Sequence, residues 1–343
     1  MTLIFVVATL VFIQSFFSVS INIFDAPGTM YTIETFEKSF KVHVSCQSSE
    51  DDSPYTVILL SSTGAPGMSL VGIQESLVEM KYKACYIDRP GYGYSDPGLY
   101  LPHSPDNNNK VYSSIISKMN VKEFVVIGHS TGGQEGLRLC GSFSSCHGAI
   151  LLDSFQDDYL REVSSNIPSS NWYGATDEAI EAEYGRVSSS MTTSRVFYSW
   201  AIPSFIVGHQ PNFQPSDKVG ELVAHYRQDK TFQSQQIDFH GRNFSEWPYE
   251  HNNFTIFIHR AYGNCTNKPS TTSLNCDQLN EDYNAVKKAA EKQVNITGIG
   301  AVTFCQQPCD HSFPYTQLNK TIEYLDLRLS AINANLNINT TSI

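Results

Sequence analysis

The chain has 343 residues, of which 41% are hydrophobic, 12% aromatic and 17% charged, and its formal net charge is −11. Charge this sparse, together with this aromatic content, excludes an intrinsically disordered chain or a coiled coil. The 34 acidic residues outnumber the 23 basic ones, so no basic excess is available to bind nucleic acid or anionic membranes. We therefore expect a globular protein with a sizeable core.

The first twenty residues predict a cleaved signal peptide. Residues 3–17 are almost wholly apolar, and residues 1–20 contain no Asp, Glu, Lys or Arg. This run has about the length of a signal-peptide core and is shorter than the ~20 residues of a membrane span. Ser18 and Ser20 supply the small residues that precede a cleavage site. We expect secretion, or delivery to a lysosome-like compartment, with no stable membrane anchor.

Asparagine sequons agree with passage through the secretory pathway. Six Asn-x-Ser/Thr triplets occur, the last of them at Asn339. We expect N-glycans on the other five, which are Asn243, Asn253, Asn264, Asn295 and Asn319.

All eight cysteines follow residue 20, and their even number makes disulfides the expected state. A nearest-neighbour interpretation pairs Cys140 with Cys146 and Cys265 with Cys276, although eight cysteines allow 105 connectivities. The spacing of Cys305 and Cys309 does not suit a Cys-x-x-Cys zinc site.

After the leader, short apolar runs alternate with helix-length segments. The expected strands are residues 40–46, 55–60, 84–87, 124–127, 149–152, 254–258 and 299–304. The expected helices are residues 68–80, 111–119, 283–294 and about 315–334. Several of the strands are apolar throughout, as in parallel sheets buried on both faces. The alternation predicts an α/β fold with a mostly parallel central sheet flanked by helices.

Residues 154–251 interrupt this alternation. They contain no strong buried-strand run but hold all three tryptophans, Trp172, Trp200 and Trp247. We interpret them as an inserted helical lid. The expected organisation is a signal peptide (1–20), a core in two parts (21–153 and 252–334), the lid (154–251) and a tail (335–343).

The strongest motif is Gly128-His129-Ser130-Thr131-Gly132, which follows an expected strand and precedes a helical segment. A G-x-S-x-G sequence in this context forms a nucleophile elbow, a sharp turn that projects the serine above the edge of the sheet. Ser130 is therefore the expected nucleophile. The backbone N–H of Thr131 is one expected oxyanion donor. The other should come from the loop at residues 62–67, where Ala65 is favoured because Pro66 has no N–H.

The segment Asp88-Arg89-Pro90-Gly91-Tyr92-Gly93-Tyr94-Ser95-Asp96 lies between that loop and the elbow. Together these motifs resemble the α/β-hydrolase superfamily, in its esterase, lipase and epoxide-hydrolase-like branch, and the elbow looks like those of haloperoxidases and arylesterases. The resemblance covers residues 55–153 well. Two departures stand out. Thr63-Gly64 replaces the usual His-Gly, and a serine nucleophile argues against epoxide hydrolases and haloalkane dehalogenases, which use Asp.

In this fold the catalytic histidine follows the last strand and precedes the last helix. His311 is the histidine at that place, whereas His129 is expected to pack beside the site. The acid is less determined by the sequence. Asp277 is favoured by its offset from the following helix, and Asp282 and Asp153 remain alternatives. Asp310 is expected to point away from the imidazole.

These residues predict a serine hydrolase that cleaves a small carboxylic ester or a lipid, with no cofactor or metal required. Two alternatives stay open. One is an exopeptidase or amidase with the same triad, for which lid carboxylates would bind the substrate amine: Asp177, Glu178, Glu181 and Glu183. The other is a secreted, non-catalytic binding protein on the same fold.

Overall fold

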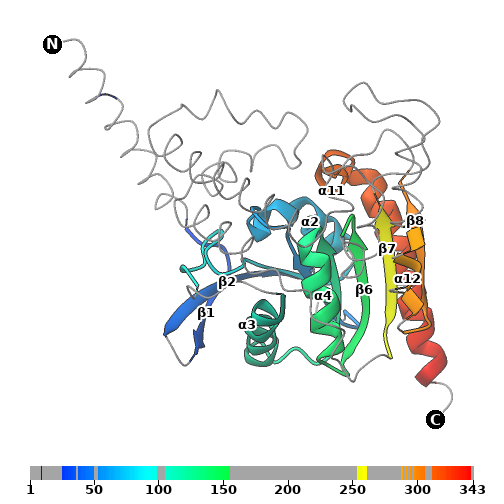
Figure 1. Ribbon diagram of the computed structural model, residues 1–343, viewed down its shortest axis with the longest axis horizontal. Coiled ribbons are helices and arrows are strands. Elements are labelled where there is room, and N and C mark those ends of the chain that lie inside the picture. Colours follow the sequence, from blue (N-terminus) through cyan, green and yellow to red (C-terminus); the bar gives the residue numbers. More distant parts are fainter. Residues whose placement is uncertain are drawn as a thin grey trace, which may run out of the picture.

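The structure is a computed structural model (Figure 1), and it describes Thr9 and residues 25–35, 38–49, 53–98, 105–154, 253–260, 287–305 except 289, 293 and 296, and 311–340. Outside the described residues lie the predicted signal peptide apart from Thr9, the predicted lid beyond Ser154, Asp277 and Asp282.

A mixed sheet of eight strands forms the centre of the described part of the chain. Its strands are β1 (Thr29–Glu34), β2 (Ser39–Gln47), β3 (Thr56–Leu60), β4 (Lys83–Ile87), β5 (Phe124–His129), β6 (Cys146–Leu152), β7 (Thr255–Arg260) and β8 (Gly300–Phe304). Their order across the sheet is β1-β2-β4-β3-β5-β6-β7-β8. The β1–β2 and β2–β4 pairs are antiparallel, and all later pairs are parallel. The predicted mostly parallel sheet is confirmed.

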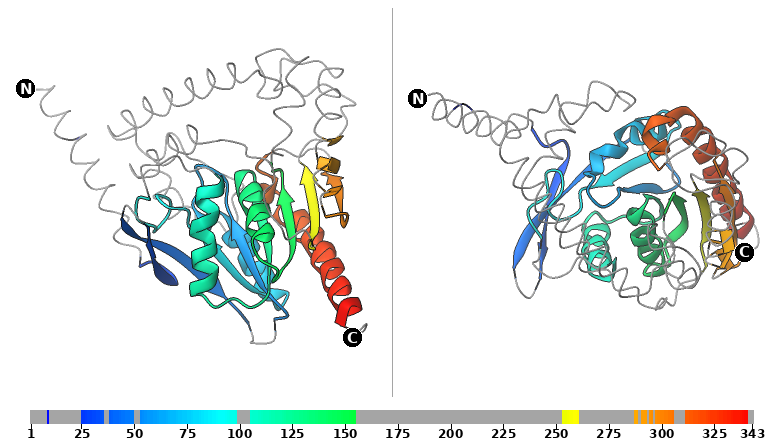
Figure 2. Two further views of the ribbon diagram at one scale, coloured as in Figure 1. Left: turned by 60° about the horizontal axis from the view of Figure 1, so that its bottom comes forward. Right: turned by 45° about the horizontal axis from the view of Figure 1, so that its top comes forward.

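Helices cover both faces of this sheet. They are the short η2 (Gly67–Leu70), α2 (Val71–Glu79), α3 (Pro105–Lys118), α4 (Thr131–Gly141), α11 (Phe313–Thr316) and α12 (Leu318–Thr340). Figure 2 shows α3 and α4 on one face and α2 and α12 on the other. The parallel strands are therefore buried from two sides, which explains why their sequences are apolar throughout.

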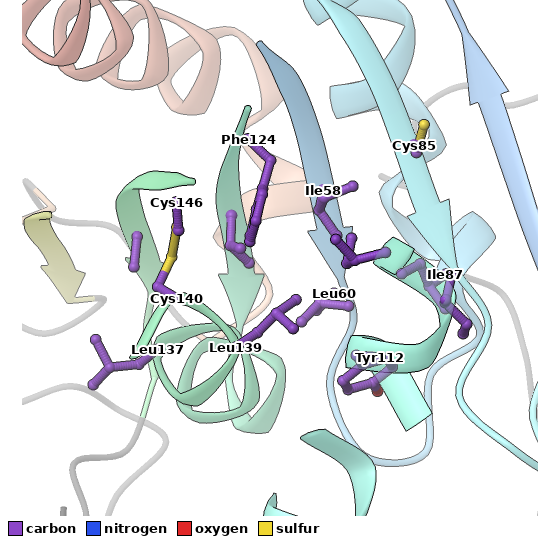
Figure 3. Packing of buried hydrophobic residues seen from close by; sticks show 14 of the residues in the cluster. Ile58, Leu60, Cys85, Ile87, Tyr112, Phe124, Leu137, Leu139, Cys140 and Cys146 are labelled. Atoms are coloured by element: carbon purple, nitrogen blue, oxygen red, sulfur yellow. A yellow bond between two sulfur atoms is a disulfide. The ribbon is translucent and has the colours of Figure 1, made fainter. Parts of the chain in front are cut away.

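Alternate residues of each central strand enter different cores. Ile58 and Leu60 of β3 belong to the same buried cluster as Leu137 and Leu139 of α4, and Figure 3 shows Leu60 beside Leu139. The intervening Val57 and Leu59 face the opposite way and pack with residues of α2 and α12. This alternation follows from the two-residue period of a strand.

The expected strands and the helices expected at 68–80, 111–119 and 315–334 fall on observed elements, with end points that differ by a few residues. The described residues of the helix expected at 283–294, from 287 onward, are helical. The helix predicted at 111–119 begins earlier, at Pro105. Strand β1 was not expected, because it lies at the sheet edge and Ile33 is its one fully buried residue. Such a strand has no continuous apolar run to identify it.

Two disulfides lie within the described chain. Cys140–Cys146 joins the end of α4 to the start of β6, as predicted, and is visible in Figure 3. Cys46–Cys85 connects residues that face each other across the antiparallel β2–β4 pair. Cys305 is also disulfide-bonded, and its partner lies outside the described residues, as does the predicted Cys265–Cys276 pair.

Removing each described disulfide should affect stability unequally. Cys46 and Cys85 are separated by 39 residues in sequence, and Cys140 and Cys146 by 6. Because a longer closed loop removes more entropy from the unfolded chain, the Cys46→Ala/Cys85→Ala variant should lose about 4 kcal/mol in the free energy of unfolding, and the Cys140→Ala/Cys146→Ala variant about 2 kcal/mol. Urea denaturation of both double variants measures this, and equal losses would contradict the loop-length argument.

Candidate active site

Ser130 occupies a strained turn between a strand and a helix. Strand β5 ends at His129 and helix α4 begins at Thr131, so Ser130 alone makes the connection. Its backbone angles are φ 55° and ψ −122°, a conformation that non-glycine residues rarely adopt. The turn requires close backbone approach, because a Cβ on Gly132 would lie 2.2 Å from the carbonyl oxygen of Leu60. The local geometry is the one that the G-x-S-x-G motif predicts.

His311 lies beside this turn and is hydrogen-bonded to Asp153. Its Nδ1 is 2.6 Å from Asp153 Oδ2, although the two residues are 158 positions apart in sequence. A carboxylate only accepts, so Nδ1 carries a proton, and in the neutral form of the ring the lone pair is then on Nε2. The imidazole is half exposed while the Asp153 side chain is buried. This is the arrangement that a general base and its orienting acid require.

Asp153 directly follows β6 and has a positive φ of 44°. Its backbone N–H donates to the carbonyl oxygen of His259 in the neighbouring strand β7, at 2.7 Å. This bond fixes the position of the Asp153 backbone, from which the side chain extends. Of the three carboxylates that the sequence left open, Asp153 is the one that the structure pairs with His311. Asp277 and Asp282, the other two, lie outside the described residues.

Arg260, the last residue of β7, is a site residue that the sequence analysis missed. Its Nε is 3.4 Å from Asp153 Oδ1, the oxygen that does not bond His311. Its Nη1 donates to the carbonyl oxygen of Ser154. Both Arg260 and Asp153 are buried. The signal in the sequence was an arginine that directly follows the apolar run of β7 and His259.

His129 connects the elbow to the histidine loop. Its Nε2 lies 2.9 Å from the carbonyl oxygen of His311, and the hydroxyl of Tyr315 bonds its Nδ1. The carbonyl can only accept, so Nε2 carries the proton and Nδ1 accepts from the tyrosine. Burial, together with the nearby His311, lowers the pKa of His129 to about 3. His129 is therefore neutral and connects the turn to His311 and Tyr315 by hydrogen bonds, which agrees with the expectation that it packs beside the site.

The loop that was expected to complete the oxyanion hole is tied to the start of α4. As the first residue of that helix, Thr131 has a backbone N–H with no carbonyl of the helix to receive it. The amide of Thr63 donates to Thr131 Oγ1 at 2.7 Å. The amide of Ala65, the expected second donor, instead donates to the carbonyl oxygen of Ser62 at 3.1 Å. It is therefore engaged within its own loop.

Arg89 and Glu135 form a buried ion pair next to Thr131, the residue that follows Ser130. Arg89 Nη2 lies 2.7 Å from Glu135 Oε2 and 3.4 Å from Thr131 Oγ1. Glu135 also accepts from the hydroxyl of Tyr112 at 2.9 Å and from the side chain of Asn108 at 2.8 Å. Burial and the nearby Glu135 hold the pKa of Tyr112 well above its usual value, so its hydroxyl remains a donor. The buried carboxylate is thus paired on both oxygens.

Asp88 supports the loop at residues 62–67, which was expected to complete the oxyanion hole. One of its carboxylate oxygens accepts the backbone N–H of Gly67 at 2.6 Å, and the other lies 2.8 Å from His43 Nδ1. Asp88 therefore holds the loop at residues 62–67, and Arg89 contacts the start of α4. This is a physical role for the Asp88–Asp96 motif.

Comparison with known proteins supports the fold. No family model matches the chain. The 2-hydroxy-6-oxononadienedioate/2-hydroxy-6-oxononatrienedioate hydrolase of Escherichia coli K12 is 24% identical over 130 residues, which cover 37% of this chain and 44% of that protein. The chain thus aligns with less than half the length of the curated relatives it matches.

Solved structures match over nearly the whole chain. A probable hydrolytic enzyme of Pseudomonas aeruginosa PAO1 superposes with a TM-score of 0.60 at 12% identity, covering 90% of this chain and 94% of that one. An esterase of Exiguobacterium antarcticum superposes with a TM-score of 0.57 at 16% identity, covering 89% and 99%. At such identities the likeness concerns the fold, and it agrees with the sheet order described above.

The acceptor role of Thr131 can be tested by an isosteric change. Thr131→Val should lower the free energy of unfolding by about 1–2 kcal/mol, because the Thr63 amide and Arg89 lose the oxygen that both contact. Thr131→Ser retains the hydroxyl and serves as the control, with a smaller loss. Urea denaturation of the two variants measures the difference. Equal destabilisation would show that the hydroxyl contributes no more than the methyl group, and would contradict the acceptor role.

The neutral state of His129 predicts a pH dependence of stability. Below pH ~6.5 the unfolded chain protonates this residue, whereas the folded chain does not until about pH 3. The free energy of unfolding should therefore fall as pH decreases through this window, by about 1.4 kcal/mol per pH unit from this residue. A His129→Gln variant can make both hydrogen bonds without titrating, so between pH 7 and 5 it should lose about 2 kcal/mol less than the wild type. Parallel curves would refute the argument.

Proposed function

We propose that this chain, which has the α/β-hydrolase fold, is a serine hydrolase that cleaves carboxylic esters through an acyl-enzyme. The observation that carries the proposal is the 2.6 Å bond between His311 Nδ1 and Asp153 Oδ2, beside the strained turn that presents Ser130. A histidine oriented by a buried carboxylate next to a serine at a nucleophile elbow is the combination that acyl transfer uses.

In this proposal Ser130 Oγ attacks the ester carbonyl carbon while His311 Nε2 takes the hydroxyl proton. The C–O bond to the alcohol then breaks, and the imidazolium returns the proton to the leaving oxygen. Water repeats the sequence on the acyl-enzyme and releases the acid. Asp153 holds the ring in the reactive tautomer and stabilises the imidazolium. The backbone N–H of Thr131 stabilises the oxyanion.

The choice of esters rests on the fold comparisons and on the sequence. Proteins of similar structure include a thermophilic esterase from Thermogutta terrifontis and the esterase of Exiguobacterium antarcticum. The E. coli relative is named for the hydrolysis of a different class of substrate. We infer a small ester or a lipid as the substrate class, with the aromatic-rich segment 154–251 as a lid over the site.

Secretion belongs to the same proposal. The apolar residues 3–17, the disulfides and the sequons support it. Three of the sequon asparagines lie in the described chain with their side chains exposed, namely Asn253, Asn295 and Asn319. No helix in the described ranges is long and apolar enough to cross a membrane.

Labelling with a fluorophosphonate tests the nucleophile, and hydrolysis of p-nitrophenyl butyrate tests turnover. Ser130→Ala should abolish labelling, because the phosphonate reacts with an activated serine. Asp153→Asn should lower kcat by about 10³–10⁴, because an amide favours the wrong imidazole tautomer. Asp277→Asn, at the acid favoured by sequence spacing, should leave kcat within about threefold of wild type.

The pair of aspartate variants separates Asp153 from Asp277, two of the three candidate acids. Loss of turnover in Asp277→Asn, with Asp153→Asn unaffected, would reverse the assignment of the acid while leaving the serine mechanism in place. A folded wild type that neither reacts with the probe nor hydrolyses the ester would instead favour the non-catalytic binding protein.

A further inference from the structure

The Asp153 carboxylate has two partners, the imidazole of His311 and the guanidinium of Arg260. Oδ2 lies 2.6 Å from His311 Nδ1, and Oδ1 lies 3.4 Å from Arg260 Nε. Arg260 is held in this position from its other end, because its Nη1 donates to the carbonyl oxygen of Ser154. Its backbone carbonyl accepts the N–H of Cys305 at 2.8 Å. The guanidinium is therefore fixed against the acid by contacts at its side chain and its backbone.

We propose that Arg260 is a positioning residue that keeps Asp153 ionised and keeps His311 unprotonated to a lower pH than the Asp153–His311 pair would reach alone. The proposal rests on the proposed function, because it concerns the base of that reaction. The reactive pair carries one negative charge, on Asp153, and becomes neutral when it binds a further proton. A buried positive charge beside the pair stabilises the negative state and so opposes that proton.

The direction does not depend on which residue receives the proton. If the proton enters the imidazole, the neutral form is an ion pair, and if it enters the carboxyl, the neutral form is an uncharged pair. In both cases the positive guanidinium favours the state without the added proton. Arg260 therefore acts on the pair as a unit.

The other polar groups near His311 do not supply this charge. His129 of the elbow is neutral, since burial and His311 lower its pKa to about 3. Burial and Arg328 of α12 lower the pKa of His259, which precedes Arg260 on β7, to about 4.

The remaining neighbours carry no positive charge that is described. Tyr315 of α11 donates to His129. Asp310, next to His311 in sequence, lies outside the described residues. Among the described groups, Arg260 is the cation in direct contact with the acid.

The test is the pH dependence of fluorophosphonate labelling of Ser130, measured as a second-order rate constant between pH 4 and 9 in the full chain. In Arg260→Gln the midpoint of the acid limb should move up by about one pH unit. At a pH on that limb, the rate constant relative to its plateau should therefore be about tenfold below that of the wild type. Arg260→Lys keeps the charge and should keep the wild-type midpoint.

Two further variants keep the test decisive. Arg260→Met retains an unbranched side chain and replaces the Gln variant if thermal unfolding shows that the latter is misfolded. Lys122→Gln removes one positive charge just before β5, at the opposite end of this strand from the elbow, and should not move the midpoint.

A neutral Arg260 variant that folds and retains the wild-type midpoint would overturn the proposal, even if its plateau were lower, because a purely structural role changes the plateau alone. A Lys variant shifted as far as the Gln variant would overturn the role of charge. These outcomes differ from failure of the proposed function, in which the wild type itself would not be labelled.

Discussion

The structure of the site depends on one buried carboxylate at the end of β6. Asp153 is fixed by its own backbone, whose N–H bonds the carbonyl oxygen of His259 in β7. Its side chain then bonds His311, which follows β8, and contacts Arg260 at the end of β7. An ionised carboxylate is costly to bury unless its oxygens are paired. Those partners therefore stabilise the charge and at the same time bring three parallel strand ends to one point.

The opposite side of the site is held by a second buried carboxylate. Glu135 of α4 binds Arg89, which also reaches Thr131 and the loop after β3. His129 bonds the backbone of His311, so the segments that carry Ser130 and His311 are connected through the residue that precedes Ser130. The strained backbone of Ser130 is thus surrounded by fixed contacts. Strain of this kind persists when the surrounding structure determines it.

Much of this arrangement could be predicted from local sequence. Continuous apolar runs identified the buried strands, and the glycines around Ser130 identified the turn, because close backbone approach leaves no alternative to glycine there. The place of His311 followed from chain order. The 140–146 disulfide followed from the short distance along the chain.

The contacts that escaped prediction are those between distant segments. Along the chain Asp153 directly follows β6 and Asp277 comes after β7, and the sequence alone does not show which side chain meets the imidazole. The turn that engages the Ala65 amide depends on how the loop closes onto Thr131. Arg260 was unexpected because an arginine at the end of a strand is normally exposed to solvent. Here it is buried and contacts Asp153, which directly follows β6.

Placing the acid on β6 leaves the end of β7 for a cation, and this has a consequence for catalysis. In the proposed reaction Asp153 is ionised and His311 is neutral at rest, so these two side chains and Arg260 are together uncharged. They gain one positive charge when His311 takes the proton of Ser130. Without Arg260 the same step would convert one negative charge into none. In a site of low dielectric constant, a neutral resting state costs less to bury, but the imidazolium formed during attack is stabilised less. In this proposal Arg260 lowers the electrostatic stabilisation of the transition state, but it also keeps the base unprotonated at lower pH. The second effect suits a hydrolase that works below neutral pH, where a more basic histidine would be protonated and unable to activate the serine.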